Sequence, residues 1–225
     1  MNLLRAARLV AEKDLRVEWR TKEIVTTSAL FAALVVFIAS LAFYLDPAHG
    51  RQIAPGVLFV AAAFSGVLAL GRAFAKEREF DALTGLRMSP IPRAAIYLGK
   101  VAASFLLLAV IDLGLLAMTA LFFHLEPGLG LLHVLAFLLL STAGFVSAGC
   151  LFGALTVTTK ARDLVLSVVL FPLLAPAILA GVVGSREALE GAPLAELGSW
   201  YGLLALFFAT FLSGGLWLFE ILTEE

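Results

Sequence analysis

Six long apolar stretches, separated by polar or charged connections, make up most of the chain. A helix needs about 20 largely apolar residues to cross the hydrocarbon core of a bilayer. All six stretches are of this length, and the pattern therefore predicts six transmembrane helices, over residues 24–45, 53–74, 98–123, 131–157, 164–183 and 201–221. The fifth contains Pro172 and Pro176, and because proline lacks a backbone N–H we expect this helix to be kinked.

The first 23 residues have a different pattern, in which apolar and charged positions fall on opposite faces of a helix. Such an amphipathic helix is suited to lie in the membrane interface, with its basic face toward anionic headgroups. Arg16 and Arg20 belong to the basic face. Asp14 and Glu18 intrude on the apolar face, and we expect them to pair with a basic residue of another segment or of a partner. The chain is thus predicted to have an interfacial helix (1–23) and a six-helix transmembrane domain (24–225).

Residues 74–92, FAKEREFDALTGLRMSPIP, form the most charged connection inside the chain. The composition of residues 75–84 favours a short helix, which Gly85 and then Pro90 and Pro92 would end. The connection also holds apolar residues, which favour burial against a protein surface. We therefore predict an interface over residues 75–92; a solvated loop whose charges only enforce topology is the alternative. The interface residues are Glu77, Arg78, Glu79, Phe80, Asp81, Leu83, Leu86, Arg87, Ser89 and Pro90.

The connection between the fifth and sixth stretches, SREALEGAPLAELGSW, is the longest one on its side of the membrane. Ser185, followed closely by Glu187 and Glu190, is typical of a helix start. One or two short helices over about 185–199, or an ordered loop, are the two interpretations that the pattern allows.

Composition and charge agree with a membrane protein and fix its predicted orientation. Hydrophobic residues make up 61% of the 225 residues and charged ones only 15%, against about 45–50% and 25% in soluble domains. The net charge of −1 gives no indication of nucleic-acid binding. The connections expected on one side hold fourteen of the sixteen lysines and arginines, and the other side holds Arg51 and Arg186. Because basic connections stay in the cytoplasm, both termini are predicted to be cytoplasmic.

Motifs for catalysis or cofactor binding do not occur in the chain. It lacks the phosphate-binding loop that an ATPase needs, and also H-E-x-x-H, C-x-x-C and G-x-S-x-G. Cys150 is the single cysteine, and His49, His124 and His133 lie near the ends of predicted spans, as solvated loop histidines do. The first 23 residues are too polar for a cleavable signal peptide. We expect no enzymatic site and no metal site.

Asp112 is the one acidic residue in the middle of a predicted span. An ionisable group at that depth is costly and is a functional candidate. It is either a proton-coupling carboxylate, as in a secondary transporter, or a structural group that makes an interhelix hydrogen bond or a dimer contact.

The order of these features resembles the ABC-2-type exporter permeases and, more closely, the CcmB family of haem-exporter permeases of cytochrome c maturation. The resemblance rests on KDLRVEWRTKE (13–23), IAPGVLFVAA (53–62), FAKEREFDALTGLRMSPIPRAAIYLGK (74–100) and FPLLAPAI (171–178). The block 74–100 is the most specific of the four. The chain departs from many relatives at Thr84 and at Phe59.

The resemblance implies a permease of the bacterial inner membrane without an ATPase site of its own. It implies that two copies work with two copies of a CcmA-type ATPase, and that the segment after the second span acts as a coupling helix in a groove of that ATPase. The implied partners are CcmC, CcmD and the haem chaperone CcmE, with haem handled by the complex and no cofactor bound by this chain.

Three other functions remain open from the residues alone. An ABC-2 permease could export another cargo, such as a drug, a lipid or a polysaccharide. Asp112 could serve a proton-coupled carrier that needs no ATPase. A non-transporting membrane scaffold is the third.

Overall fold

The computed structural model describes residues 2–44, 47–79, 91–155 and 162–221. In these residues the chain forms helices only, which confirms the predicted all-α fold. The helices are α1 (Leu3–Thr21), α2 (Glu23–Ala42), α3 (Pro47–Glu79), α5 (Arg93–Phe122), α6 (Leu129–Leu155), α7 (Arg162–Leu189) and α8 (Leu194–Ile221).

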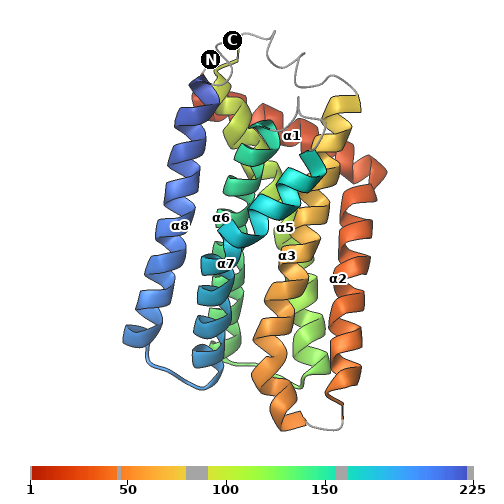
Figure 1. The fold of residues 1–225 in the computed structure, drawn as a ribbon, viewed down its shortest axis with the longest axis vertical. Coiled ribbons are helices and arrows are strands. Elements are labelled where there is room, and N and C mark those ends of the chain that lie inside the picture. Colours follow the sequence, from red (N-terminus) through yellow and green to blue (C-terminus); the bar gives the residue numbers. More distant parts are fainter. Residues whose placement is uncertain (1, 45–46, 80–90, 156–161, 222–225) are drawn as a thin grey trace.

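Six of the described helices, all except α1, are long and apolar enough to cross a membrane. They stand side by side as an elongated bundle, and α1 lies across one end of it, which we call the α1 end (Figure 1). The end of α8 lies at the α1 end as well. The prediction of six transmembrane helices is therefore confirmed, and the chain is a multi-pass membrane protein.

Helix starts and corners follow local sequence signals. Lys22 adopts a left-handed backbone conformation (φ 53°) and ends α1, so that α2 begins at the next residue in a new direction. α3 begins at Pro47 and α5 directly after Pro92, two positions where the missing N–H of proline costs no helix hydrogen bond. Both helices consequently start several residues earlier than the apolar pattern predicts.

The connection between α7 and α8 is shorter than the sequence indicates. Instead of separate short helices over about 185–199, α7 continues to Leu189 and α8 begins at Leu194. The segment REALE consists of good helix formers, which extend α7 beyond the apolar stretch. Gly191 has a φ of 84°, which favours glycine, and the chain turns there.

α7 bends within its length, as its two prolines predict. Its first half is inclined across the bundle, and its second half runs beside α6 (Figure 1). Pro172 and Pro176 lie in the middle part of the helix, where each removes one backbone donor.

Small residues allow large side chains of neighbouring helices to approach the backbone. A Cβ at Gly144 of α6 would lie 2.6 Å from the ring of Phe207 on α8. A Cβ at Gly184 of α7 would lie 2.8 Å from the ring of Phe137 on α6. These glycines of α6 and α7 thus serve close packing within the bundle.

Tyr97 joins three helices near the α1 end. It is fully buried on α5, and its hydroxyl lies 3.0 Å from the carbonyl oxygen of Ser147 on α6 and 3.1 Å from that of Phe211 on α8. The single hydroxyl hydrogen lies within reach of both carbonyl oxygens and is shared between them. Its ring occupies the space that a side chain at Gly215 of α8 would need.

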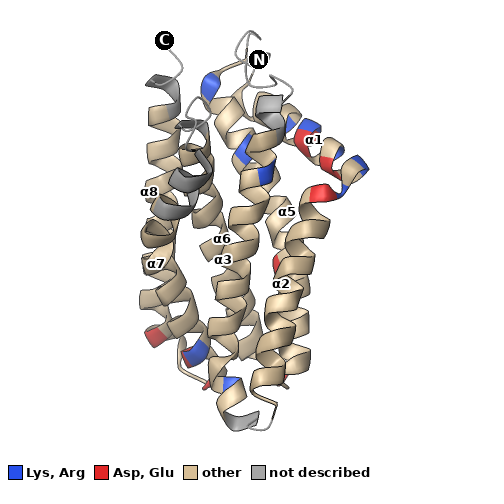
Figure 2. Ribbon diagram, turned by 45° about the vertical axis from the view of Figure 1, so that its right-hand side comes forward, with Lys and Arg blue, Asp and Glu red and all other residues tan. Residues whose placement is uncertain are grey.

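Charged residues gather at the two ends of the bundle and on α1, whereas the middle is almost entirely uncharged (Figure 2). Many large apolar side chains of α2, α5 and α8 are exposed on the outside, among them Leu34, Val110 and Leu206. This distribution fits a bundle whose middle is surrounded by lipid.

The contact between Tyr97 and Gly215 yields a prediction for stability. Gly215→Val forces its side chain into the ring of Tyr97, which has no room to move, and we expect a loss of about 1–3 kcal/mol. Gly214→Val on the same helix is the matched control, because no atom lies within 4 Å of a Cβ there. Thermal unfolding in detergent measures both. Equal melting temperatures for the two variants would contradict this packing.

Candidate functional site

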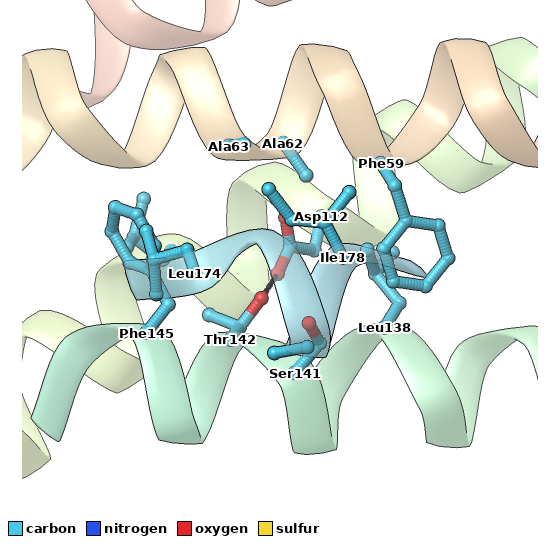
Figure 3. A pocket seen from close by; sticks show the side chains of 12 residues that line it. Phe59, Ala62, Ala63, Asp112, Leu138, Ser141, Thr142, Phe145, Leu174 and Ile178 are labelled. Atoms are coloured by element: carbon cyan, nitrogen blue, oxygen red, sulfur yellow. Dashed lines mark hydrogen bonds between the residues drawn. The ribbon is translucent and has the colours of Figure 1, made fainter. Parts of the chain in front are cut away.

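Asp112 is buried in the interior of the bundle. The carboxylate is on α5, and only 1% of the residue is exposed. Thr142 of α6 donates a hydrogen bond of 2.7 Å to its Oδ2 atom (Figure 3). The sequence left open whether Asp112 couples protons or makes a structural contact. The structure shows the interhelix hydrogen bond that the structural interpretation expects.

A small cavity lies beside this hydrogen bond, between α3, α5, α6 and α7. Its volume is about 20 Å³, which is room for about one water molecule. Besides Asp112 and Thr142, its polar wall includes Ser141, and the other described residues that line it are apolar. Figure 3 shows Phe59, Leu138 and Leu174 around the polar group.

The composition of this wall limits the chemistry of the pocket. No lysine, arginine or histidine is among the described residues that line it, so an ionised Asp112 would have no opposite charge beside it. An unpaired buried charge is costly, whereas a neutral carboxyl with one water partner is not. The pocket is suited to hold a proton and a water molecule, and it is too small for an organic substrate.

The second polar cluster holds α1 against the start of α5. At Gly99 the two helices are so close that a Cβ would lie 2.6 Å from the carbonyl oxygen of Ala7 and 2.6 Å from Cβ of Val10. Beside it, the Nζ atom of Lys100 lies 3.6 Å from the Oδ2 atom of Asp14. Lys100 is only 5% exposed, so Asp14 supplies a partner for an ammonium group that would otherwise be costly to bury.

Glu18, the other acidic residue on the apolar face of α1, is buried at the corner with α2. Its Oε1 atom accepts a hydrogen bond of 3.0 Å from the backbone N–H of Val25. This N–H belongs to the first turn of α2, which has no intrahelical acceptor for it, and a carboxylate is favourable at that end of a helix. In the same first turn of α2, Glu23 forms an ion pair of 3.0 Å with Arg72 of α3.

The outer face of α1 has a shallow groove of about 280 Å³. Arg16 and Arg20 line it, together with Leu9 and Val17, and all four are exposed. The structure thus places basic and apolar groups side by side on the face of α1 that points away from the bundle.

The predicted interface segment is mostly beyond the described part of the structure. Glu77, Arg78 and Glu79 are in the last turn of α3, but their side chains lie outside the described residues. Phe80, Asp81, Leu83, Leu86, Arg87, Ser89 and Pro90 lie outside them entirely. The described ends of the segment, Glu79 and Ile91, lead from α3 into α5 at the α1 end.

The histidines do not assemble a metal site within the described residues, where no group of three possible ligands occurs. His133 is not a simple solvated residue, because its Nδ1 atom lies 2.9 Å from the hydroxyl of Tyr201. Tyr201 also stacks on Phe137.

The roles of Tyr97, Gly99 and Lys100 were not predicted from the sequence. All three lie in the block YLGK (97–100), which begins five residues after Pro92. A lysine just inside an apolar stretch is a signal that could have indicated Lys100, because it needs either a partner or a route to the headgroups. No local pattern reveals that Tyr97 reaches two other helices.

Two substitutions of Asp112 test whether it has a structural role or couples protons. Asp112→Asn keeps an oxygen that can accept from Thr142 but cannot release a proton, so a structural role predicts a melting temperature and a transport activity close to wild type. Asp112→Leu removes the acceptor and is expected to cost about 1–3 kcal/mol, because the Thr142 hydroxyl loses its partner. Full loss of transport in a stable Asp112→Asn protein would favour proton coupling.

Comparisons with known proteins agree with this architecture. The family model described as CcmB protein matches residues 5–214. Several proteins named heme exporter protein B are similar over most of their length. The one from Paracoccus denitrificans is 32% identical over 72% of this chain and 74% of its own. The one from Pseudomonas aeruginosa is 28% identical over 82% of each chain, and that from Haemophilus influenzae 29% over 76% of each. Because the family match extends over most of the sequence and over all six spans except the end of the last, the chain belongs to the CcmB protein family.

Proposed function

We propose that this chain is the permease subunit of an ABC transporter complex in cytochrome c biogenesis. It couples ATP hydrolysis by a separate ATPase subunit to the export of haem or to the release of a haem-loaded chaperone. The observation that carries the proposal is the family match over residues 5–214, with relatives named heme exporter protein B.

The source of energy is a partner protein. In this proposal a separate CcmA-type ATPase supplies hydrolysis, which is consistent with a sequence that contains no phosphate-binding loop. Residues 75–92 are the coupling helix in this proposal, and Glu77 and Arg87 are among the residues that contact the ATPase.

The start of α5 supports this position for the coupling helix. α5 begins at Arg93, directly after the proposed contact segment. Within its first two turns, Gly99 and Lys100 contact α1, and Tyr97 reaches α6 and α8. A displacement of the coupling helix would therefore act on several helices together.

The α1 end is the cytoplasmic end in this proposal, and the membrane is the bacterial inner membrane. Arg16 and Arg20 of α1, Arg72 in the last turns of α3 and Arg93 at the start of α5 belong to this end, whereas Arg51 in the first turns of α3 and Arg186 in the last turn of α7 belong to the other. Figure 2 shows Lys and Arg (blue) at both ends of the bundle. The bias in the connections supports this orientation. α1 is then the interfacial helix, with the groove that holds Arg16 and Arg20 toward the headgroups.

Haem is handled by the complex and not ligated by this chain. The Asp112 cavity has room for about one water molecule and so offers no path for a porphyrin in this conformation. The proposed partners are CcmC, CcmD and the chaperone CcmE, together with a second copy of this chain.

Assembly with the ATPase tests the proposal. Co-expression with a CcmA-type ATPase is expected to give a complex that survives detergent extraction and size-exclusion chromatography. Glu77→Lys combined with Arg87→Glu is expected to reduce the recovered complex at least several-fold, because it reverses two charges of the contact segment. Glu196→Lys, the same type of charge reversal on an exposed residue at the other end of the bundle, is the control and is expected to assemble normally.

Two results would count against the proposal. If the Glu77 and Arg87 reversals leave both assembly and ATPase stimulation unchanged, the coupling helix is not at residues 75–92. If no complex forms with a CcmA-type ATPase and the chain transports without one, the ABC permease function itself is wrong.

A further inference from the structure

A cleft of about 420 Å³ opens at the end of the bundle opposite α1. The start of α3, the loop before α6 and the end of α7 form its walls. Its charged and polar residues are Arg51, Gln52, Glu126, Arg186 and Glu190. The volume lies in the range of small-molecule sites, about 300–1,000 Å³.

The two arginines of this cleft stand out from the charge distribution of the whole chain. Arg51 and Arg186 are the two basic residues that the sequence places in the sparsely charged connections, and both line the same cleft. Lysine and arginine in these connections oppose the orientation that the other fourteen enforce. Because Arg51 of α3 and Arg186 of α7 nevertheless line the same cleft, we infer that they serve to bind an anionic group there.

The ion pairs that these two arginines form within the chain are weak. Arg51 lies 3.6 Å from Glu126, and Arg186 of α7 lies 3.4 Å from Glu190, the residue that follows the end of that helix. All four side chains are at least half exposed, and exposed pairs of this kind contribute little to stability. A ligand with one anionic and one cationic group can offer each of these four side chains a contact of opposite charge.

The cleft lies where three of the membrane-crossing helices begin or end, the level at which lipid headgroups are expected. Its walls include the ends of three spans, which begin at His49 and Leu129 and end at Leu189. These positions mark the boundary between the hydrocarbon core and the headgroup region. Leu125 and Leu189 provide an apolar wall beside the charged one, so an amphiphile fits the cleft better than a fully hydrated ion.

We propose that this cleft binds the headgroup of a zwitterionic phospholipid of the ethanolamine type. Its phosphate contacts Arg51 and Arg186, because guanidinium groups bind phosphate oxygens in a bidentate manner. Its ammonium group contacts Glu126 and Glu190, and its glycerol region packs against Leu125 and Leu189. The site does not depend on the proposed transport function, since it involves neither the ATPase nor haem.

Native mass spectrometry of the purified full chain tests the site. The delipidated protein is titrated with phosphatidylethanolamine, and the affinity of the first bound lipid is measured. Arg51→Gln with Arg186→Gln is expected to weaken this affinity about tenfold or more, because two charge-assisted contacts are lost. Arg5→Gln with Arg93→Gln removes the same charge at the α1 end and is expected to leave the affinity unchanged.

A second variant tests how the headgroup is recognised. Glu126→Gln with Glu190→Gln keeps the arginines but removes the partners of the ammonium group. It is expected to shift the binding preference from phosphatidylethanolamine toward phosphatidylglycerol, which has the phosphate and no ammonium. The melting temperature of each variant shows that a change in binding does not come from unfolding.

Three outcomes would overturn the proposal. The first is wild-type affinity for phosphatidylethanolamine in the folded double arginine variant. The second is an unchanged headgroup preference in the double glutamate variant. The third is displacement of the lipid by millimolar inorganic phosphate, which would assign the cleft to soluble phosphate compounds instead of a lipid.

Discussion

The close contact between α1 and the start of α5 determines the arrangement of the α1 end of the bundle. Gly99 lets the backbone of α1 lie directly against α5, and Asp14 provides the partner for the buried Lys100. Because Lys100 is costly to bury alone, α1 cannot leave α5 without exposing or isolating that charge. Tyr97 then connects the same two turns of α5 to α6 and α8. These contacts attach the amphipathic helix α1 to the bundle, so that it does not lie on the lipid surface alone.

The same requirement for partners governs the interior of the bundle. Within a bilayer, polar groups have to find hydrogen-bond partners in the protein. Asp112 and Thr142 satisfy each other between α5 and α6, with room for one water molecule beside them. At the start of α2, Glu18 accepts a hydrogen bond from the backbone N–H of Val25, which has no acceptor within the helix. These two polar contacts thus fix how α5 meets α6 and how α1 meets α2, and close packing at Gly144 and Gly184 fixes other helix pairs.

Much of the fold, but less of the site, can be predicted from the sequence. The six spans, the amphipathic α1 and the bend of α7 follow from hydropathy, periodicity and the positions of Pro172 and Pro176, all of which are local signals. The partners of Asp14, Tyr97 and Asp112 depend on residues 30 to 114 positions away or on another helix, and no local pattern specifies them. The connection after α7 is shorter than the two interpretations of its sequence allowed, because REALE is charged but also strongly helix-forming and continues α7.

The central claim is that the Asp14–Lys100 pair, together with the contact at Gly99, holds α1 to α5. A double-mutant cycle with Asp14→Asn and Lys100→Gln, measured as the free energy of unfolding in a bilayer-like medium, tests it directly. A coupling free energy of about 0.5–3 kcal/mol is expected for residues in contact, and it should exceed that of the exposed pair Arg8 and Glu12 on the same helix. A coupling free energy of zero within error would contradict the claim, because α1 would then be held by its apolar contacts alone.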